Sequence, residues 1–331
     1  MKTARATACS NIALVKYWGK RVDTDRELNL PAVGSLSMTL DALRTETLVE
    51  AADADAFVLD GQPAAEGPAK KVFSHLDLLW SRTARGGPRP RCRVVSDNHF
   101  PTAAGLASSA SGFAALTLAG AAALELSATP QMLSALSRMG SGSAARSVWG
   151  GFVRLDRGEA RDGSDCIARP LFSAEHWNLR LLVVQTTTGK KTIGSTEGME
   201  ASRRTSPYYD AWTHTHVADL DAAEAAIGAR DLEELGRLVE HSCFKMHACM
   251  IATDPALLYW NGTTVDVIHR VRQARAEGLP GWLTIDAGPH VKVLCEADVA
   301  DPLADALREV EGVTEVVVAA PGPDAHVEVQ A

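Results

Sequence analysis

The chain has 331 residues, of which 46% are hydrophobic, and a formal net charge of -8 at pH 7. A chain of this length can bury a sizeable core, and the usual size of domains favours two of them. The negative charge argues against broad nucleic-acid binding, because that binding requires a basic surface that neutralises phosphates. A small anionic ligand remains compatible with it, since a cleft can concentrate positive charge locally.

Apolar runs and cysteine spacing indicate where in the cell the protein is expected to lie. No apolar run is long enough to span a bilayer, and the first residues pass into the charged stretch KYWGKR before a signal-peptide core could form. The six cysteines are scattered without a C-x-x-C pair, which argues against a zinc site or a disulfide scaffold. We therefore expect a cytoplasmic protein with reduced, packed thiols and no membrane partner.

The first half of the chain predicts strands and helices in alternation. Apolar runs indicate strands, beginning with a β meander, over residues 3–16, 35–40, 45–51, 56–59, 91–96 and 151–155. Apolar residues at helical spacing indicate helices over residues 68–80, 108–126 and 128–138, followed by a glycine-serine turn at 140–143. This pattern is typical of an α+β domain.

The second half begins with the buried-looking strand LRLLVVQT. Helices are expected over residues 217–227, 231–250, 255–277 and 299–311, with further strands in WLTID, VKVLC and TEVVVA. The closing order of two strands, a helix and a strand suits an open sheet covered by helices on one face, the split βαβ type. The predicted domains are residues 1–180 and 181–331.

A run of small residues, PTAAGLASSASGFAAL, follows a predicted strand and leads into the helix predicted from residue 108. Backbone N–H groups at a helix start carry partial positive charge, and small side chains let a phosphate chain approach them. The alternative is an alanine-rich helix packed tightly against a neighbour. TTGKKT fails the Walker pattern, and GSGSAA follows a helix where a dinucleotide-binding fold needs a strand.

Three further motifs carry candidate site residues. NIALVKYWGK ends an apolar strand with Lys16, Tyr17 and Lys20, which either point into a cleft or form a solvated edge. MGSGSAARS holds Arg146, which could bind a carboxylate or phosphate or lie exposed at a capped helix start. WLTIDAGPHV places Asp286 after a strand, either as a turn residue or as a carboxylate in a site. Metalloprotease and serine-hydrolase motifs are missing.

Seven long motifs together resemble one known family. NIALVKYWGKR, NLPAVGSLSMTL, PTAAGLASSASGFAAL, MGSGSAARS, GSTEGM, MHACMIATDP and TIDAGP have the order and spacing of the diphosphomevalonate decarboxylases, over residues 8–293. Other members of the GHMP kinase superfamily share the glycine-rich loop but differ elsewhere. The resemblance implies an α+β GHMP kinase fold, with an N-terminal ribosomal protein S5 domain 2-like domain, a ferredoxin-like C-terminal domain and the active site between them.

The resemblance also implies a reaction. ATP and (R)-5-diphosphomevalonate would give isopentenyl diphosphate, ADP, phosphate and carbon dioxide, in the mevalonate pathway of isoprenoid biosynthesis. The C3 hydroxyl would be phosphorylated first. Mg²⁺ would be held mainly by the ATP phosphates and not by a protein metal site. Relatives of this kind suggest a homodimer.

The resemblance assigns three groups of residues. The catalytic group is Asp286, Lys16 and Arg146, in which Asp286 would orient or deprotonate the C3 hydroxyl and Lys16 would keep the carboxylate ionised. The substrate group comprises Asn11, Tyr17, Lys20, Ser141, Gly142, Ser143, Arg146 and Ser195. The ATP group comprises Pro101, Ala103, Ala104, Gly105, Leu106, Ala107, Ser108 and Ser109, with Ser109 reaching the phosphates and Ser108 capping the helix.

A polar segment over residues 186–209 contains Lys190, Lys191, Arg203 and Arg204. These cations either belong to a lid that closes over the ligands or lie in a solvated basic loop. The two readings are left open by the sequence.

The chain departs from the family pattern at two places. It has Val33, Gly34 and Ser35 where many members have Asn-Ser-Ser, and His290 where they have asparagine.

Two rival functions are compatible with the same fold. One is a sister enzyme that decarboxylates the monophosphate or phosphorylates C3 of mevalonate, and the other is a catalytically inactive nucleotide-binding regulator.

Overall fold

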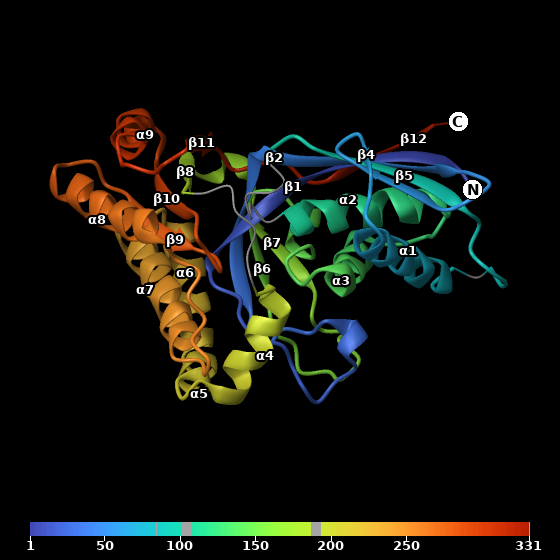
Figure 1. Cartoon of the computed structure of the whole chain (residues 1–331), viewed down its shortest axis with the longest axis horizontal. Helices are drawn as coiled ribbons and strands as arrows, with labels where there is room; N and C mark the ends of the chain where they lie inside the picture. Colours follow the sequence, from blue (N-terminus) through green and yellow to red (C-terminus); the bar gives the residue numbers. More distant parts are fainter. Residues whose placement is uncertain (84, 101–107, 187–192, 331) are drawn as a thin grey trace.

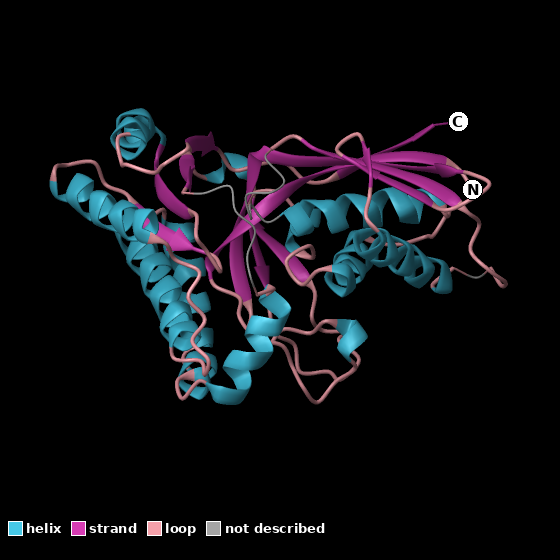
Figure 2. Ribbon diagram, in the orientation of Figure 1, coloured by secondary structure: helices cyan, strands magenta, loops and turns pink. Residues whose placement is uncertain are grey.

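A computed structural model describes residues 1–83, 85–100, 108–186 and 193–330. Within these ranges the strands form an eight-stranded sheet and a four-stranded sheet, and helices lie against both (Figures 1 and 2). None of the helices in these ranges is long and apolar enough to cross a bilayer.

The eight-stranded sheet is built mainly by the first half of the chain. Its strands are β1 (Thr3–Val15), β2 (Ser35–Ala51), β3 (Ala56–Leu59), β4 (Gln62–Pro63), β5 (Cys92–Asn98), β6 (Phe152–Leu155), β7 (Ala168–Phe172) and β12 (His326–Gln330). The order is β12-β1-β2-β5-β3-β4, and β6 pairs with both β2 and β7. The final strand of the chain therefore returns to the first strand (Figure 1).

Two predictions for this sheet were wrong. The strands expected at residues 35–40 and 45–51 are one continuous strand, β2, because the exposed polar residues between them, Asp41 and Arg44, interrupt the apolar pattern without breaking the strand. The meander stops after β2, since β5 lies between β2 and β3 and pairs in parallel with β3. A pairing between segments this far apart leaves no local signal in the sequence.

Three helices, α1 (Glu66–Ser81), α2 (Ser108–Ala123) and α3 (Pro130–Gly140), lie together beneath this sheet (Figure 2). The small residues of α2 pack against the alanines of β1 in one buried cluster that includes Ala4, Ala6, Ala114 and Ala115. Small side chains on both elements allow a close approach of helix and sheet. Residues 108–123 thus form a tightly packed, alanine-rich helix, while residues 101–107 of the small-residue run lie outside the described residues.

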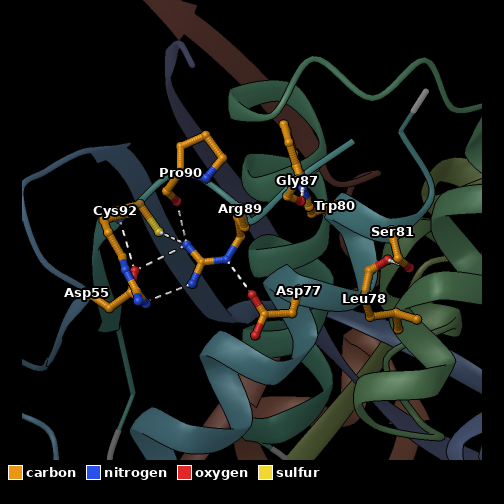
Figure 3. Close-up of polar contacts among 10 residues, drawn as sticks. Asp55, Asp77, Leu78, Trp80, Ser81, Gly87, Arg89, Pro90 and Cys92 are labelled. Atoms are coloured by element: carbon orange, nitrogen blue, oxygen red, sulfur yellow. Dashed lines mark hydrogen bonds and ion pairs between the residues drawn. The ribbon is translucent and has the colours of Figure 1, made fainter. Parts of the chain in front are cut away.

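A buried arginine ties the segment after α1 to its neighbours (Figure 3). The Arg89 guanidinium donates to both carboxylate oxygens of Asp55 at 3.2 and 2.9 Å, and its Nε donates to Asp77 on α1 at 2.8 Å. Its Nη1 also donates to the Cys92 sulfur at the start of β5. This network joins α1, β5 and the turn before β3.

The second sheet contains β8 (Leu179–Gln185), β9 (Trp282–Ile285), β10 (Val291–Glu296) and β11 (Glu315–Ala319), in the order β11-β8-β10-β9. Each pair of neighbouring strands in this sheet is antiparallel. The second half of the chain also forms the helices α4 (Ser195–Thr205), α5 (Tyr209–His214), α6 (His216–Ala229), α7 (Leu232–Ile251), α8 (Gly262–Ala276) and α9 (Ala300–Arg308). Of these, α7, α8 and α9 contact the strands of this sheet. This order is the expected ferredoxin-like, split βαβ arrangement.

The helix predicted over residues 255–277 begins later, at Gly262. Asn261 accepts a hydrogen bond from the Thr264 backbone while Thr264 bonds back to the Asn261 backbone, and this capping box starts the helix there. The polar segment after β8 contains α4, which the sequence did not predict, because its exposed face and arginines obscure the apolar spacing.

The two sheets share a core. One buried cluster contains Leu36 and Met38 of β2, Leu181 of β8, and Leu235 and Val239 of α7. This continuous packing sets the end of β1 close to the end of β9, which positions the site described next.

Candidate active site

A cleft of about 990 Å³ opens where the two sheets meet. It is lined from both halves of the chain, by the end of β1, by α1, by the turn after α3, by the start of α4 and by the residues after β9. The basic side chains at its wall are Arg26, Lys16, Lys20, Lys70, Lys71 and Arg146, whereas the acidic ones are Glu27 and Asp286. Although the protein as a whole is negative, this cleft suits an anionic ligand.

The centre of the cleft is an aspartate held by two buried lysines. Lys16 follows β1 directly and places its Nζ 2.8 Å from Oδ1 of Asp286, which follows β9. Lys292 of β10 places its Nζ 3.0 Å from Oδ2. Both lysine side chains are 1% exposed, while the Asp286 side chain is 29% exposed at the cleft. Burial by itself raises the pKa of Asp286, but the two ammonium groups outweigh it and hold this pKa far below its usual range.

Arg146 lies at the floor of the cleft within a polar network. It begins a 3-10 helix, and its Nε donates to Asn11 Oδ1 and Ser37 Oγ, each at 3.1 Å. Its Nη1 donates to Ser35 Oγ at 2.6 Å. The Asn11 amide in turn donates to Ser147 Oγ and to the Ser143 carbonyl. Burial lowers the pKa of Arg146 to about 10, and Tyr17 and Asp286 partly oppose this effect. Its bonds to neutral partners orient the guanidinium without neutralising it.

The other predicted substrate residues also meet at this cleft. The wall includes Asn11, Tyr17, Lys20, Ser141, Gly142, Ser143 and Ser195. Tyr17 Oη is buried and has no hydrogen-bond partner among the described residues, and a Cβ atom on Gly142 would lie only 2.8 Å from it. Gly142 therefore leaves room for the tyrosine hydroxyl. An unsatisfied buried hydroxyl at a cleft wall is well placed to bind a polar ligand.

The predicted ATP residues fall into two sets. Pro101, Ala103, Ala104, Gly105, Leu106 and Ala107 lie outside the described residues. Ser108 and Ser109 begin α2, and Ser109 lines the cleft, where its Oγ accepts a hydrogen bond from Ser141 Oγ at 3.3 Å. Ser108 is half-buried and is not among the described residues at the wall.

Sequence reasoning missed several residues of the site. Lys292 lies inside the apolar strand VKVLC, and a lysine in a strand that reads as buried is the signal that could have identified it. Lys70, Lys71 and Ser74 reach the cleft from α1. Their pattern is that of the polar face of an ordinary amphipathic helix, so no local signal marks them.

The candidate lid residues lie in two places. Arg203 and Arg204 are on α4 and pair with Glu200, with Arg203 Nη2 at 2.7 Å from the carboxylate. They thus carry their own acidic partner on the same helix. Lys190 and Lys191 lie outside the described residues.

The two departures from the family pattern are buried. A Cβ atom on Gly34 would lie 2.7 Å from Leu220 Cδ1 and 2.8 Å from the Leu155 carbonyl, so the chain passes too close to its neighbours here for a larger residue. His290 is 1% exposed, and its Nδ1 accepts a hydrogen bond from the Thr186 backbone N–H at 3.1 Å. It therefore holds the end of β8.

The cleft fits a magnesium ion that is bound mainly by a ligand. The described residues hold no cluster of three or more His, Cys, Asp or Glu side chains that could bind a metal. Of the two carboxylates at the wall, Asp286 is occupied by two lysines. Mg²⁺ keeps several waters and is commonly held through substrate phosphates, with few protein ligands. Ser109, Ser141 and Ser143 supply hydroxyl groups for such a complex.

Two family models match this chain. The Diphosphomevalonate decarboxylase-like N-terminal domain matches residues 8–168, and the Mevalonate 5-diphosphate decarboxylase C-terminal domain matches residues 181–321. Diphosphomevalonate decarboxylase mvd1 of Aspergillus fumigatus is 35% identical over 329 residues, which cover 93% of this chain and 80% of that protein. The human diphosphomevalonate decarboxylase is 37% identical over 310 residues, covering 87% of this chain and 75% of the human one.

Solved structures agree with these matches. Mevalonate diphosphate decarboxylase from Staphylococcus aureus superposes with a TM-score of 0.91 at 34% identity, over 99% of this chain and 98% of the other. A structure described as MDDEF in complex with MVAPP, AMPPCP and magnesium gives a TM-score of 0.90 at 37% identity, over 99% of both chains. These likenesses confirm the predicted α+β fold of the GHMP kinase type. On sequence and structure together, the chain belongs to the diphosphomevalonate decarboxylase family.

Proposed function

We propose that this protein converts (R)-5-diphosphomevalonate and ATP to isopentenyl diphosphate, ADP, phosphate and carbon dioxide, in the mevalonate pathway. The observation that carries the proposal is the Lys16–Asp286 pair, whose ammonium and carboxylate meet 2.8 Å apart at the wall of a cation-lined cleft. Membership of the family supports it, as does the structural likeness to a protein bound to MVAPP, AMPPCP and magnesium.

The chemistry explains why ATP is needed. The substrate carries a tertiary hydroxyl at C3, β to a carboxylate, and hydroxide is too poor a leaving group to depart. Phosphoryl transfer from ATP turns this hydroxyl into a phosphate ester. Loss of phosphate then builds positive charge at C3, and the carboxylate leaves as carbon dioxide. Magnesium bound to the ATP phosphates neutralises part of the charge of the transferred group.

Asp286 is the proposed catalytic carboxylate. Its ionised form accepts a hydrogen bond from the C3 hydroxyl and so aligns the oxygen with the terminal phosphate of ATP. The same negative charge stabilises the positive centre that develops at C3. Lys16 is the proposed partner, because its ammonium keeps Asp286 ionised and lies close enough to offset charge on the transferred phosphoryl group.

Arg146 has the proposed role of placing the substrate carboxylate. A strong ion pair with that carboxylate would oppose its loss, so the side chain must act mainly through geometry. The fixed network from Asn11, Ser35 and Ser37 supports this role, because it restricts the guanidinium to one orientation. Tyr17, Lys20, Ser141, Gly142, Ser143 and Ser195 are proposed to hold the substrate diphosphate. Ser109, at the start of α2, is proposed to hold the ATP phosphates.

We further propose two domains, residues 1–180 and 181–331, with β12 added to the sheet of the first. The six cysteines, all buried and free, agree with a cytoplasmic location. A homodimer is proposed from the family alone, and sedimentation velocity would test it.

A substrate panel tests the proposed function. The protein is incubated with ATP, Mg²⁺ and diphosphomevalonate, phosphomevalonate or mevalonate, and both ADP and the decarboxylated product are measured. We expect ADP and isopentenyl diphosphate in equal amounts from the diphosphate. Turnover of the monophosphate alone, or ADP without carbon dioxide from mevalonate, would identify a sister activity. ATP binding without turnover of any substrate would identify a nucleotide-binding regulator.

A further inference from the structure

Lys292 is the less expected of the two lysines that hold Asp286. It lies in the middle of the four-stranded sheet, where its register partners are Thr284 of β9 and Val183 of β8. Its side chain is 1% exposed and its Nζ lies 3.0 Å from Asp286 Oδ2, with a second, longer bond to the His290 carbonyl at 3.4 Å. It does not belong to the described wall of the cleft.

Burial of this cation is costly. A lysine inside a sheet loses its hydration, and an apolar residue of similar size would fill the same space without that cost. Asp286 is the one carboxylate that the described residues offer to Lys292 as an ion-pair partner. An apolar residue at this position could therefore stabilise the fold about as well as the lysine does. The lysine differs in that it binds the second oxygen of the Asp286 carboxylate.

The two lysines act on different oxygens of Asp286. Lys16 holds Oδ1 at 2.8 Å from the end of β1, and Lys292 holds Oδ2 at 3.0 Å from β10. A carboxylate bonded at one oxygen can still rotate about its Cβ–Cγ bond, and a second bond from another direction prevents this rotation. The part of Asp286 that remains exposed then faces the cleft in one orientation.

We propose that Lys292 is a positioning residue, which holds the second oxygen of the Asp286 carboxylate while Lys16 holds the first, and so aims the carboxylate at the C3 hydroxyl of the substrate. The role rests on the function proposed above. Lys292 touches neither substrate nor nucleotide and acts through Asp286 alone.

The charges around Asp286 agree with this role. Lys16 after β1 and Lys292 on β10 form ion pairs with it, and Arg146 on its 3-10 helix and Cys243 and His247 on α7 interact with its charge. Burial lowers the pKa of His247 to about 4, so this imidazole is neutral at physiological pH. One carboxylate between two ammonium groups leaves an excess positive charge, which favours the arrival of an anionic phosphoryl group.

Three variants of the full-length protein test the proposal. Lys292→Met removes the cation and keeps the volume, and Lys292→Arg keeps a cation. Val293→Ala is the matched control, because Val293 is the next residue of β10 and packs into the core on the other face of the sheet. Each variant is assayed with ATP, Mg²⁺ and diphosphomevalonate, and its thermal midpoint is measured.

We expect Lys292→Met to lower kcat by about tenfold or more, since a misaligned catalytic group costs that order of rate. The KM values for both substrates should change by less than about threefold, because the binding residues are intact. Lys292→Arg should recover part of kcat. Val293→Ala should lower the thermal midpoint while its kcat stays near that of the wild type.

Unchanged kcat in Lys292→Met would overturn the proposal, and so would an equal loss of kcat in Val293→Ala. A crystal structure of Lys292→Met gives a readout that needs no turnover. Positioning requires the Asp286 carboxylate to rotate or to occupy two orientations there, and a carboxylate left in place would refute it. If the wild type itself turns over none of the substrates, the proposed function fails, while this structural result still decides whether Lys292 orients Asp286.

Discussion

The Lys16 ammonium and the Asp286 carboxylate are 270 residues apart in the sequence and 2.8 Å apart in the folded protein. Lys16 is further fixed by its backbone N–H, which donates to Ser242 Oγ on α7. The pair thus joins the end of the first long strand to the second sheet, and the cleft forms around it.

Asp286→Ala should abolish most turnover and leave ATP binding intact. The loss should be about a hundredfold or more in kcat, the usual scale for a residue that aligns or deprotonates the reacting group. Stopped-flow or quench-flow product analysis measures kcat, and fluorescence titration with an ATP analogue measures binding. Near-normal turnover of this variant would contradict the role given to Asp286.

Arg146→Lys should raise the KM for diphosphomevalonate by about tenfold or more, because a lysine keeps the charge but cannot reproduce the forked geometry. The affinity for ATP should change little. Steady-state kinetics with each substrate varied in turn measures both effects. An increase confined to the KM for ATP would place this arginine at the nucleotide instead.

Gly34→Ala should destabilise the fold by about 1–3 kcal/mol, since the new methyl group overlaps Leu220 and the Leu155 carbonyl. Gly112→Ala is the matched control, because a Cβ atom there meets nothing within 4 Å and alanine favours the helix. Urea unfolding gives both free energies. Equal stability of the two variants would show that the backbone just before β2 can move away from Leu220 and Leu155 without cost.

Arg89→Met should cost about 3–5 kcal/mol of unfolding free energy, because it leaves the partly buried Asp55 carboxylate with one exposed cation (Figure 3). Arg91→Met is the control. Its side chain is 65% exposed and bonds to the same Asp55, so its removal should cost at most about 1 kcal/mol. A small effect of both variants would mean that the segment after α1 is held by packing alone.

Three buried histidines should make the protein less stable in weak acid. Burial lowers the pKa values of His75, His216 and His247 to about 4, whereas the unfolded chain has histidine pKa values near 6.5. The unfolded state therefore binds more protons between these values, so the stability present above pH 6.5 is lost as the pH falls toward 4. Each histidine contributes up to about 2 kcal/mol of this loss by pH 5.

Urea unfolding at pH 7.5 and pH 5 measures this dependence. His75→Gln should reduce the difference between the two pH values, since glutamine can still bond to Thr117 without titrating. The same change at the exposed His214 should leave the difference as it is. If His75→Gln leaves the difference in unfolding free energy between pH 7.5 and pH 5 unchanged, other groups cause the acid sensitivity.

The sequence by itself was sufficient to locate the ends of several strands and helices, and the candidate site residues at those ends. Lys16, Ser109, Arg146 and Asp286 were candidates because each follows an apolar strand or begins a helical segment. Periodicity placed them at such ends, and the resemblance to the family assigned them to the site. The ferredoxin-like order of the second sheet was readable for the same reason. Only the tertiary structure decided that β5 inserts between β2 and β3, that Lys70 reaches the cleft from α1, and that Lys292 meets Asp286. These contacts depend on strand register and on packing between distant segments, which hydrophobic periodicity does not encode.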